Sequence, residues 1–241
     1  MKIVILPDYD AVSEYACARL IAKMRETVRR PFVLGLPTGG TPVGMYRKIA
    51  EKHIDFSNII TFNMDEYIGL SKDNVNSFYH FMDENLYSKV NLDPSHINIP
   101  DGTAADIERE CAEYEKKITA AGGIDLFFGG VGSNGHIAFN EPGSSFSSRT
   151  RVIELTEKTI RDNSRFFADP SEVPKKAVSV GIATILSAGE LVFLATGENK
   201  ARAVKTAVEG EISEKCPVTA LRKHGNATLV VDGKAAALLD R

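Results

Sequence analysis

The stretch FVLGLPTGGTPVGMYRKI, residues 32–49, decides the fold class. It opens on FVLGL, which carries no polar side chain, as expected of a strand that is buried on both faces of a sheet. The turn GLPTGGTP at 35–42 follows, and a helical pattern that contains Met45 comes directly after it. Thr41 is expected to cap this helix and Pro42 to be its first residue. A buried strand that passes through a tight turn into a helix is the repeating unit of α/β proteins.

The same alternation of strands and helices continues on both sides of this stretch. The other strand candidates are Ile3–Leu6, Ile59–Asn63, Ile124–Phe128, Val178–Gly181, Leu191–Ala195 and Thr228–Val231. Helical spacing of apolar residues marks Val12–Met24 and Ile107–Ile118. No repeat or linker interrupts the pattern. It predicts one α/β domain over residues 1–241, with an open, Rossmann-like, mostly parallel sheet and helices on both faces.

The composition is that of a soluble globular protein and excludes several classes. The 241 residues carry 29 Lys and Arg against 32 Asp and Glu, a formal charge of −3, and 43% are hydrophobic. This weak acidity argues against nucleic acid as a partner. The cysteines Cys17, Cys111 and Cys216 are odd in number and far apart, which favours a reducing compartment. With no recognisable signal peptide or membrane span, a cytoplasmic location without membrane association is expected.

Two segments that follow strands are candidates for binding an anion, because ligands of open α/β sheets bind at the carboxyl ends of the strands. Free N–H groups around Thr38, Gly39, Gly40 and Thr41 would favour a phosphate, although a simple glycine turn is the alternative. A Walker A loop is excluded because no Gly-Lys-Ser/Thr follows. Lys200 is expected in the first turn of a helix, where it opposes the helix dipole unless an anion lies there. A solvated surface lysine is the alternative.

Two further segments carry groups suited to proton transfer. NMDEY at 63–67 places adjacent carboxylates at a strand end, so only one of them should face the crevice, as a general base or as a helix cap. GGVGSNGHIAFNEPGSS at 129–145 presents Asn134, His136 and Glu141. Its glycine pattern is not a dinucleotide fingerprint, because a Pro-Gly pair soon breaks any helix. His136 suits proton transfer near neutral pH or a structural role; a metal site is not expected, since no second His lies at ligand spacing.

Together these segments resemble the glucosamine-6-phosphate deaminase family. The matching motifs are GLPTGGTP, TFNMDEYIGL, GVGSNGHIAFNEPGSSFSSRT, NSRFF and the Lys of GENKA. The resemblance implies conversion of D-glucosamine 6-phosphate and water to D-fructose 6-phosphate and ammonia, with no metal or redox cofactor. It implies that Asp65 moves the proton from C2 to C1, and that His136 moves a proton between the ring oxygen and O1. Glu141 and Asn134 would orient and polarise that histidine.

The resemblance also implies a phosphate-binding site. Gly39, Gly40 and Thr41 would lie against the sugar phosphate, and Arg165 and Lys200 would form a cationic clamp.

Many members carry Asp where this chain has Asn134, so the charge role would fall to Glu141. The allosteric hexamers carry Lys where this chain has Ile153, and they have a longer tail. Arg151 beside Glu154 would be a poor phosphate site, so we expect a monomer or small homo-oligomer without activation by N-acetylglucosamine 6-phosphate. The alternatives are a sugar-phosphate lactonase, which leaves Asp65 without a task, and a non-catalytic sugar-phosphate sensor.

Overall fold

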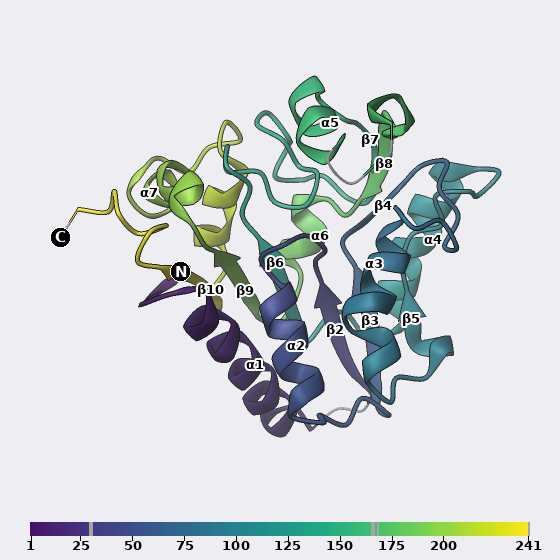
Figure 1. Ribbon diagram of the computed structural model, residues 1–241, viewed down its shortest axis with the longest axis horizontal. Coiled ribbons are helices and arrows are strands. Elements are labelled where there is room, and N and C mark those ends of the chain that lie inside the picture. The colour runs from purple at the N-terminus through teal and green to yellow at the C-terminus, as the bar shows by residue number, and fades with distance from the viewer. Residues whose placement is uncertain (29–30, 165–166, 168, 241) are drawn as a thin grey trace.

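The computed structural model describes residues 1–28, 31–164, 167 and 169–240, and its main feature is a seven-stranded sheet (Figure 1). In spatial order the strands are β1 (Lys2–Leu6), β10 (Ala227–Asp232), β9 (Leu191–Ala195), β6 (Leu126–Gly130), β2 (Phe32–Leu36), β3 (Ile59–Asn63) and β5 (Ile97–Asn98). Every neighbouring pair is parallel, and Leu34 of β2 lies beside Thr61 of β3. The prediction of an open, mostly parallel sheet is confirmed.

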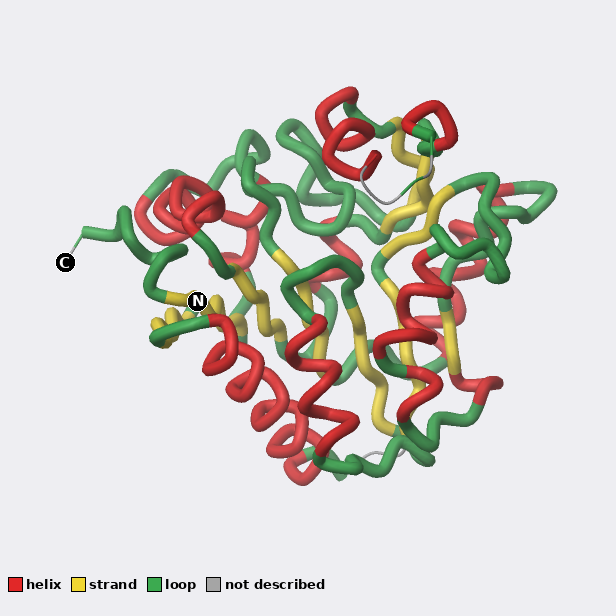
Figure 2. Tube along the Cα trace, in the orientation of Figure 1, coloured by secondary structure: helices red, strands yellow, loops and turns green. Residues whose placement is uncertain are grey.

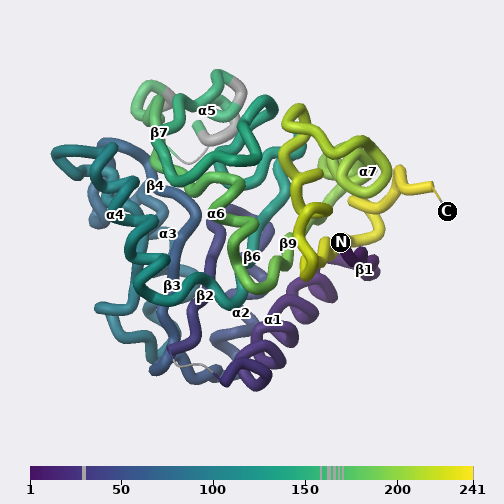
Figure 3. The backbone as a smooth tube through the Cα atoms, turned by 180° about the vertical axis from the view of Figure 1, so that it is seen from behind, coloured from purple at the N-terminus to yellow at the C-terminus, as the bar shows by residue number. Residues whose placement is uncertain are grey.

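Helices cover both faces of this sheet, as the sequence predicts. One face carries α1 (Tyr9–Glu26), α2 (Val43–Glu51) and α3 (Phe78–Asn85). The other face carries α4 (Ile107–Ala120), α6 (Ile182–Leu186) and α7 (Ala201–Glu209), and Figure 3 shows it from behind. No helix in the described ranges has both the length and the apolar character that a bilayer span requires.

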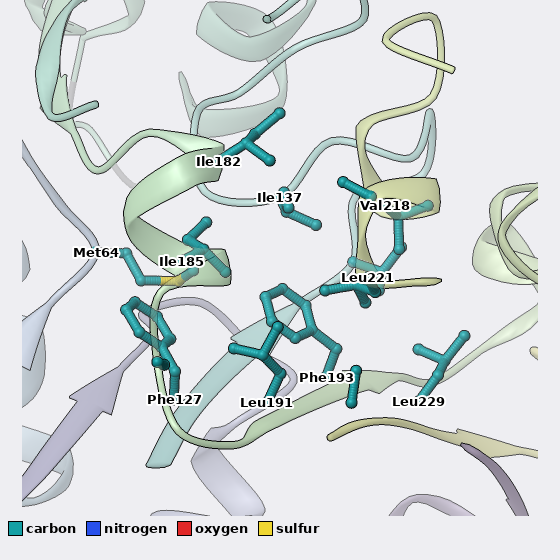
Figure 4. Close-up of a cluster of buried hydrophobic side chains, with 14 of the residues drawn as sticks. Met64, Phe127, Ile137, Ile182, Ile185, Leu191, Phe193, Val218, Leu221 and Leu229 are labelled. Atoms are coloured by element: carbon teal, nitrogen blue, oxygen red, sulfur yellow. The ribbon is translucent and has the colours of Figure 1, made fainter. Parts of the chain in front are cut away.

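Alternate residues of the strands supply the two halves of the core. In β9, Leu191 and Phe193 pack with residues of α4, α6 and α7, whereas Val192 and Leu194 pack with residues of α1, α2 and α3. Figure 4 shows Phe193 among its neighbours in the first half. Because burial of apolar surface contributes about 25 cal/mol per Å², strands that are apolar on both faces hold the helices on both sides.

A second, three-stranded sheet lies beyond the carboxyl ends of the parallel strands (Figure 1). It consists of β4 (Asp65–Tyr67), β8 (Lys176–Ser179) and β7 (Arg151–Glu154), paired antiparallel in that order. The expectation that Val178–Gly181 belongs to the parallel sheet is wrong, because its residues pair with β4 and β7 instead. Ile160 of the short helix α5 (Glu157–Asn163) packs against the apolar cluster of this small sheet.

The order of the strands creates a switch point between β2 and β6. The chain passes from β2 outward to β3 and β5, and then returns to build β6 on the opposite side of β2. Crevices at such points are where open α/β sheets bind ligands. Figure 2 shows loops gathered at this end of the central strands.

The start of α2 differs from the expectation that Thr41 caps it. The helix begins at Val43, and the cap position is Pro42, which has no side-chain hydrogen bond to the helix. The hydroxyl of Tyr9, at the start of α1, instead accepts a hydrogen bond from the Gly44 N–H at 2.7 Å. An acceptor from a distant element therefore satisfies an N–H group that a local cap satisfies in many helices.

All three cysteines are buried and unpaired. Burial raises the pKa of the Cys17 thiol to about 11 and that of Cys111 to about 11. It also raises the pKa of Cys216. Since the thiolate is the reactive form, these three thiols are expected to be unreactive at neutral pH.

Candidate active site

The four candidate segments follow four strands that are neighbours in the parallel sheet. Lys200 follows β9, the His136 loop follows β6, the turn at Thr38–Thr41 follows β2, and Asp65 follows β3. Because the strands are parallel, their carboxyl ends lie at one edge of the sheet. The fold therefore gathers these segments at the switch point.

Asp65 is the most deeply buried carboxylate among the predicted site residues. Its side chain is 6% exposed, and its Oδ1 has no hydrogen-bond partner among the described residues. Burial raises the pKa of Asp65 to about 8, and repulsion from Glu66 adds to the effect. A carboxylate in this environment is a stronger base than one in water.

Glu66 points away from Asp65 to the start of α3, as the alternation of side chains along a strand requires. Its Oε1 accepts hydrogen bonds from the N–H groups of Tyr67 (2.8 Å) and Phe78 (3.0 Å), and its Oε2 accepts one from Tyr79 (3.0 Å). One of the two predicted uses of the NMDEY segment is thus present, because Glu66 caps a helix.

His136 lies in a tight glycine-rich loop without a helix, as predicted. The N–H of Gly132 donates to the His136 carbonyl at 2.9 Å, and the N–H of Gly135 donates back to Gly132 at 3.0 Å. A Cβ atom on Gly132 would lie 2.3 Å from Nε2 of His136, so only glycine leaves room for the ring there. Gly135 has φ +86°, which also favours glycine.

Glu141 holds the other side of this histidine. Its Oε1 lies 3.5 Å from Nδ1 of His136 and accepts a hydrogen bond from the Thr159 hydroxyl at 2.8 Å. Its Oε2 accepts one from Nδ2 of Asn134 at 2.6 Å. Burial acts to raise the pKa of Glu141, but the interactions with His136, Asn134 and Thr159 outweigh it and lower the pKa to about 2.

The predicted trio of Asn134, His136 and Glu141 is therefore a contiguous network. Asn134 also accepts a hydrogen bond from the His136 N–H at 3.2 Å, so its amide fixes both the backbone and Glu141. The negative charge in this network belongs to Glu141. Thr159 is a member that the sequence did not reveal, since it comes from α5, 18 residues after Glu141.

The turn after β2 is open on the side where an anion would lie. Cβ atoms added to Gly39 or Gly40 would meet nothing within 4 Å, and Gly39 has φ +98°. The Tyr9 hydroxyl donates to the Gly40 carbonyl at 3.1 Å and links this turn to α1. Thr41 lies in the turn that leads into α2.

Lys200 ends a 3₁₀ turn (Glu198–Lys200) immediately before α7, slightly earlier than the predicted first helical turn. Its N–H donates to the Gly197 carbonyl at 3.1 Å. The Gly197 N–H in turn donates to both carboxylate oxygens of Asp232, at 3.1 and 3.0 Å. Asp232 is the last residue of β10 and was missed by the sequence patterns. Arg165, the other predicted clamp residue, lies outside the described residues.

Metal binding has no obvious ligand set in the part of the chain that is described. No group of three or more His, Cys, Asp or Glu side chains there could hold a metal ion. The arrangement offers a buried carboxyl group, a histidine beside a carboxylate and a turn with open backbone.

Comparisons with known proteins agree with this arrangement. A family model described as glucosamine-6-phosphate isomerases/6-phosphogluconolactonase matches residues 7–230. A glucosamine-6-phosphate deaminase from Parabacteroides distasonis is 48% identical over 98% of this chain and 91% of its own length. One from Thermoanaerobacter pseudethanolicus is 45% identical over 99% of this chain and 95% of its own.

Solved structures show the same likeness. A monomeric glucosamine-6-phosphate deaminase superposes with a TM-score of 0.95 at 42% identity, covering 99% of this chain and 100% of that one. A 6-phosphogluconolactonase from Trypanosoma cruzi has a TM-score of 0.81 at 20% identity, over 100% of this chain and 97% of that one, which shows a common fold. The chain belongs to the glucosamine-6-phosphate isomerase/6-phosphogluconolactonase family.

Proposed function

We propose that this protein is a glucosamine-6-phosphate deaminase, which converts D-glucosamine 6-phosphate and water to D-fructose 6-phosphate and ammonia. The observation that carries the proposal is the pairing of a buried base, Asp65, with the His136–Glu141–Asn134 network at one edge of the sheet. Relatives with 45–48% identity over nearly the whole chain carry the same name.

The chemistry divides into three steps that these groups can perform. His136 moves a proton from O1 to the ring oxygen, which opens the ring to the free aldehyde. Asp65 then takes the proton from C2 and returns it to C1, and a second proton passes from the nitrogen to O1, which together convert the amino aldehyde to an imine at C2 with a hydroxyl group at C1. Water adds to that imine carbon, and the C–N bond breaks to give the ketone and ammonia.

Glu141 and Asn134 serve the first step through His136. A carboxylate that stays ionised stabilises the imidazolium and fixes the ring, which is how many catalytic histidines are oriented. Asp65 serves the second step because proton abstraction beside a carbonyl needs a strong, desolvated base.

The phosphate group is proposed to bind the turn at Thr38–Thr41, with Lys200 and Arg165 as the cationic clamp. Support comes from the open backbone above Gly39 and Gly40 and from the position of Lys200 after β9, at the same edge of the sheet. Backbone N–H groups and a cation together favour a dianion.

We further propose a monomer or small homo-oligomer in a reducing compartment such as the cytoplasm, without nucleic-acid partners. The monomeric relative and the three buried, unpaired cysteines support this.

Ammonia release from D-glucosamine 6-phosphate by the purified protein tests the function. The same preparation is assayed with 6-phosphogluconolactone. Ammonia release without lactone hydrolysis is expected. Lactone hydrolysis without ammonia release would assign the lactonase activity, and binding without turnover of either compound would assign a sensor.

A further inference from the structure

Glu66 occupies an unusual place for a carboxylate that carries no substrate role in the proposed function. Its side chain is 3% exposed, and the hydrogen bonds it accepts all come from backbone N–H groups. In the described part of the chain, no Lys or Arg forms an ion pair with it. A charge this deeply buried is costly unless donors compensate it, so the three N–H groups are its support.

Those donors join two elements that carry different parts of the site. Tyr67 lies on β4 beside Asp65, and Phe78 and Tyr79 are the first two residues of α3. The positive end of the α3 dipole adds to the stabilisation of the Glu66 carboxylate. Glu66 therefore ties the strand that presents Asp65 to the rigid start of a helix.

Its position also places a second negative charge next to Asp65 in a buried environment. Burial raises the pKa of Glu66 to about 7, although the three backbone donors oppose the rise. The two carboxylates belong to consecutive residues, and repulsion from the Glu66 charge also raises the pKa of Asp65.

The other groups around the pair leave this repulsion undisturbed. Burial, with a smaller contribution from the Asp65 charge, raises the pKa of Tyr46 on α2 and of Tyr114 on α4 well above the usual value, so both hydroxyls stay neutral. On β8, Lys176 lies 3.5 Å from Glu154, and on α3, His80 lies 3.4 Å from Glu84.

We propose that Glu66 is a positioning residue for the isomerisation step, which fixes Asp65 against α3 and keeps it a strong base through its own negative charge. The inference rests on the proposed function, in which Asp65 moves the proton from C2 to C1. It predicts that removal of the Glu66 charge makes Asp65 a more ordinary carboxylic acid.

The test is Glu66→Gln, with Ser77→Ala as the matched control. Glutamine keeps the size and can keep the two bonds at Oε1, so it loses one hydrogen bond to the first turn of α3. Ser77→Ala also loses one such bond, from the His80 N–H at 3.0 Å, together with the bond from its hydroxyl to the Lys72 carbonyl at 3.2 Å, but leaves the Glu66 charge in place. The readout is the carboxyl ¹³C NMR titration of Asp65 in the ligand-free protein.

In Glu66→Gln, the Asp65 midpoint should move to lower pH by about one unit, because a neighbouring like charge is gone. In Ser77→Ala it should stay within a few tenths of a unit. The acid limb of kcat/KM should move in the same direction in Glu66→Gln, and the plateau at high pH should fall because a weaker base acts more slowly.

Several results would overturn the inference. An unchanged Asp65 midpoint in Glu66→Gln would do so, as would equal shifts in both variants, which would indicate a merely structural role. If Glu66→Gln does not fold, the wild-type titration decides: Asp65 must respond in two steps, and one step near pH 4 contradicts the proposal. Because this titration needs no turnover, its outcome is separate from failure of the wild-type protein to release ammonia.

Discussion

Replacing Asp65 with Asn should make the protein more stable, by an amount that grows with pH. Over the range from about pH 4 to about pH 8, the folded chain keeps a proton on Asp65 that the unfolded chain has released, because burial raises the pKa from 3.8 to about 8. Wild-type stability therefore falls as pH rises through this range. The asparagine variant has no proton to lose at this position.

The size of the gain follows from linkage. Each pH unit between the two pKa values changes the unfolding free energy by about 1.4 kcal/mol. The variant should therefore be close to wild type near pH 4.5 and should gain about 3 to 4 kcal/mol by pH 7. Activity should fall by orders of magnitude, since the base is gone.

Urea unfolding of both proteins at closely spaced pH values from 4.5 to 8 measures the difference directly. A difference in unfolding free energy that is the same at every pH would refute the reasoning, because it would mean that Asp65 titrates alike in both states. A stability gain of the variant that shrinks as pH rises would mean that the pKa of folded Asp65 is lowered and not raised.

The remaining predictions concern catalysis, binding and regulation. His136→Gln should lower kcat on the cyclic substrate by a factor of about 10² to 10⁴. The kcat on an open-chain analogue, which bypasses ring opening, should fall much less. Equal losses of kcat on both substrates would mean that His136 does not act in ring opening. Lys200→Ala should raise KM roughly 10- to 100-fold, as loss of a charged hydrogen bond to phosphate implies, and unchanged affinity for a phosphate-bearing inhibitor would contradict the clamp. Plots of rate against substrate concentration should be hyperbolic with and without N-acetylglucosamine 6-phosphate, because Ile153 and Glu154 offer no attraction for a second phosphate. Sigmoidal curves that become hyperbolic when this compound is added would show a regulatory site.

Local patterns predicted those parts of the fold that depend on neighbours in the chain. The bounds of β2, β3 and β9 agree with the predicted strands. The strand β4 was not predicted, because its sequence DEY is charged and its pairing partner lies more than a hundred residues away in β8. Apolar character alone likewise could not assign β8 to the small sheet.

The candidate site likewise contains residues that local sequence predicted and residues that it could not predict. Asp65, His136 and Glu141 were found because each follows a strand or a glycine-rich turn closely. Thr159 and Tyr9 were missed, since each reaches the site from an element that only tertiary packing brings near. The orientation of the Glu66 side chain also depends on where α3 begins in space, which cannot be predicted from the local sequence.

The buried cysteines give the protein a practical advantage for spectroscopy. Because the native thiols are shielded and the chain has no tryptophan, a single engineered cysteine would be the only site that a maleimide dye labels quickly. Val75 is 71% exposed in the loop that leads into α3. A dye at that position would report movement of the helix start in a chain that contributes no tryptophan fluorescence.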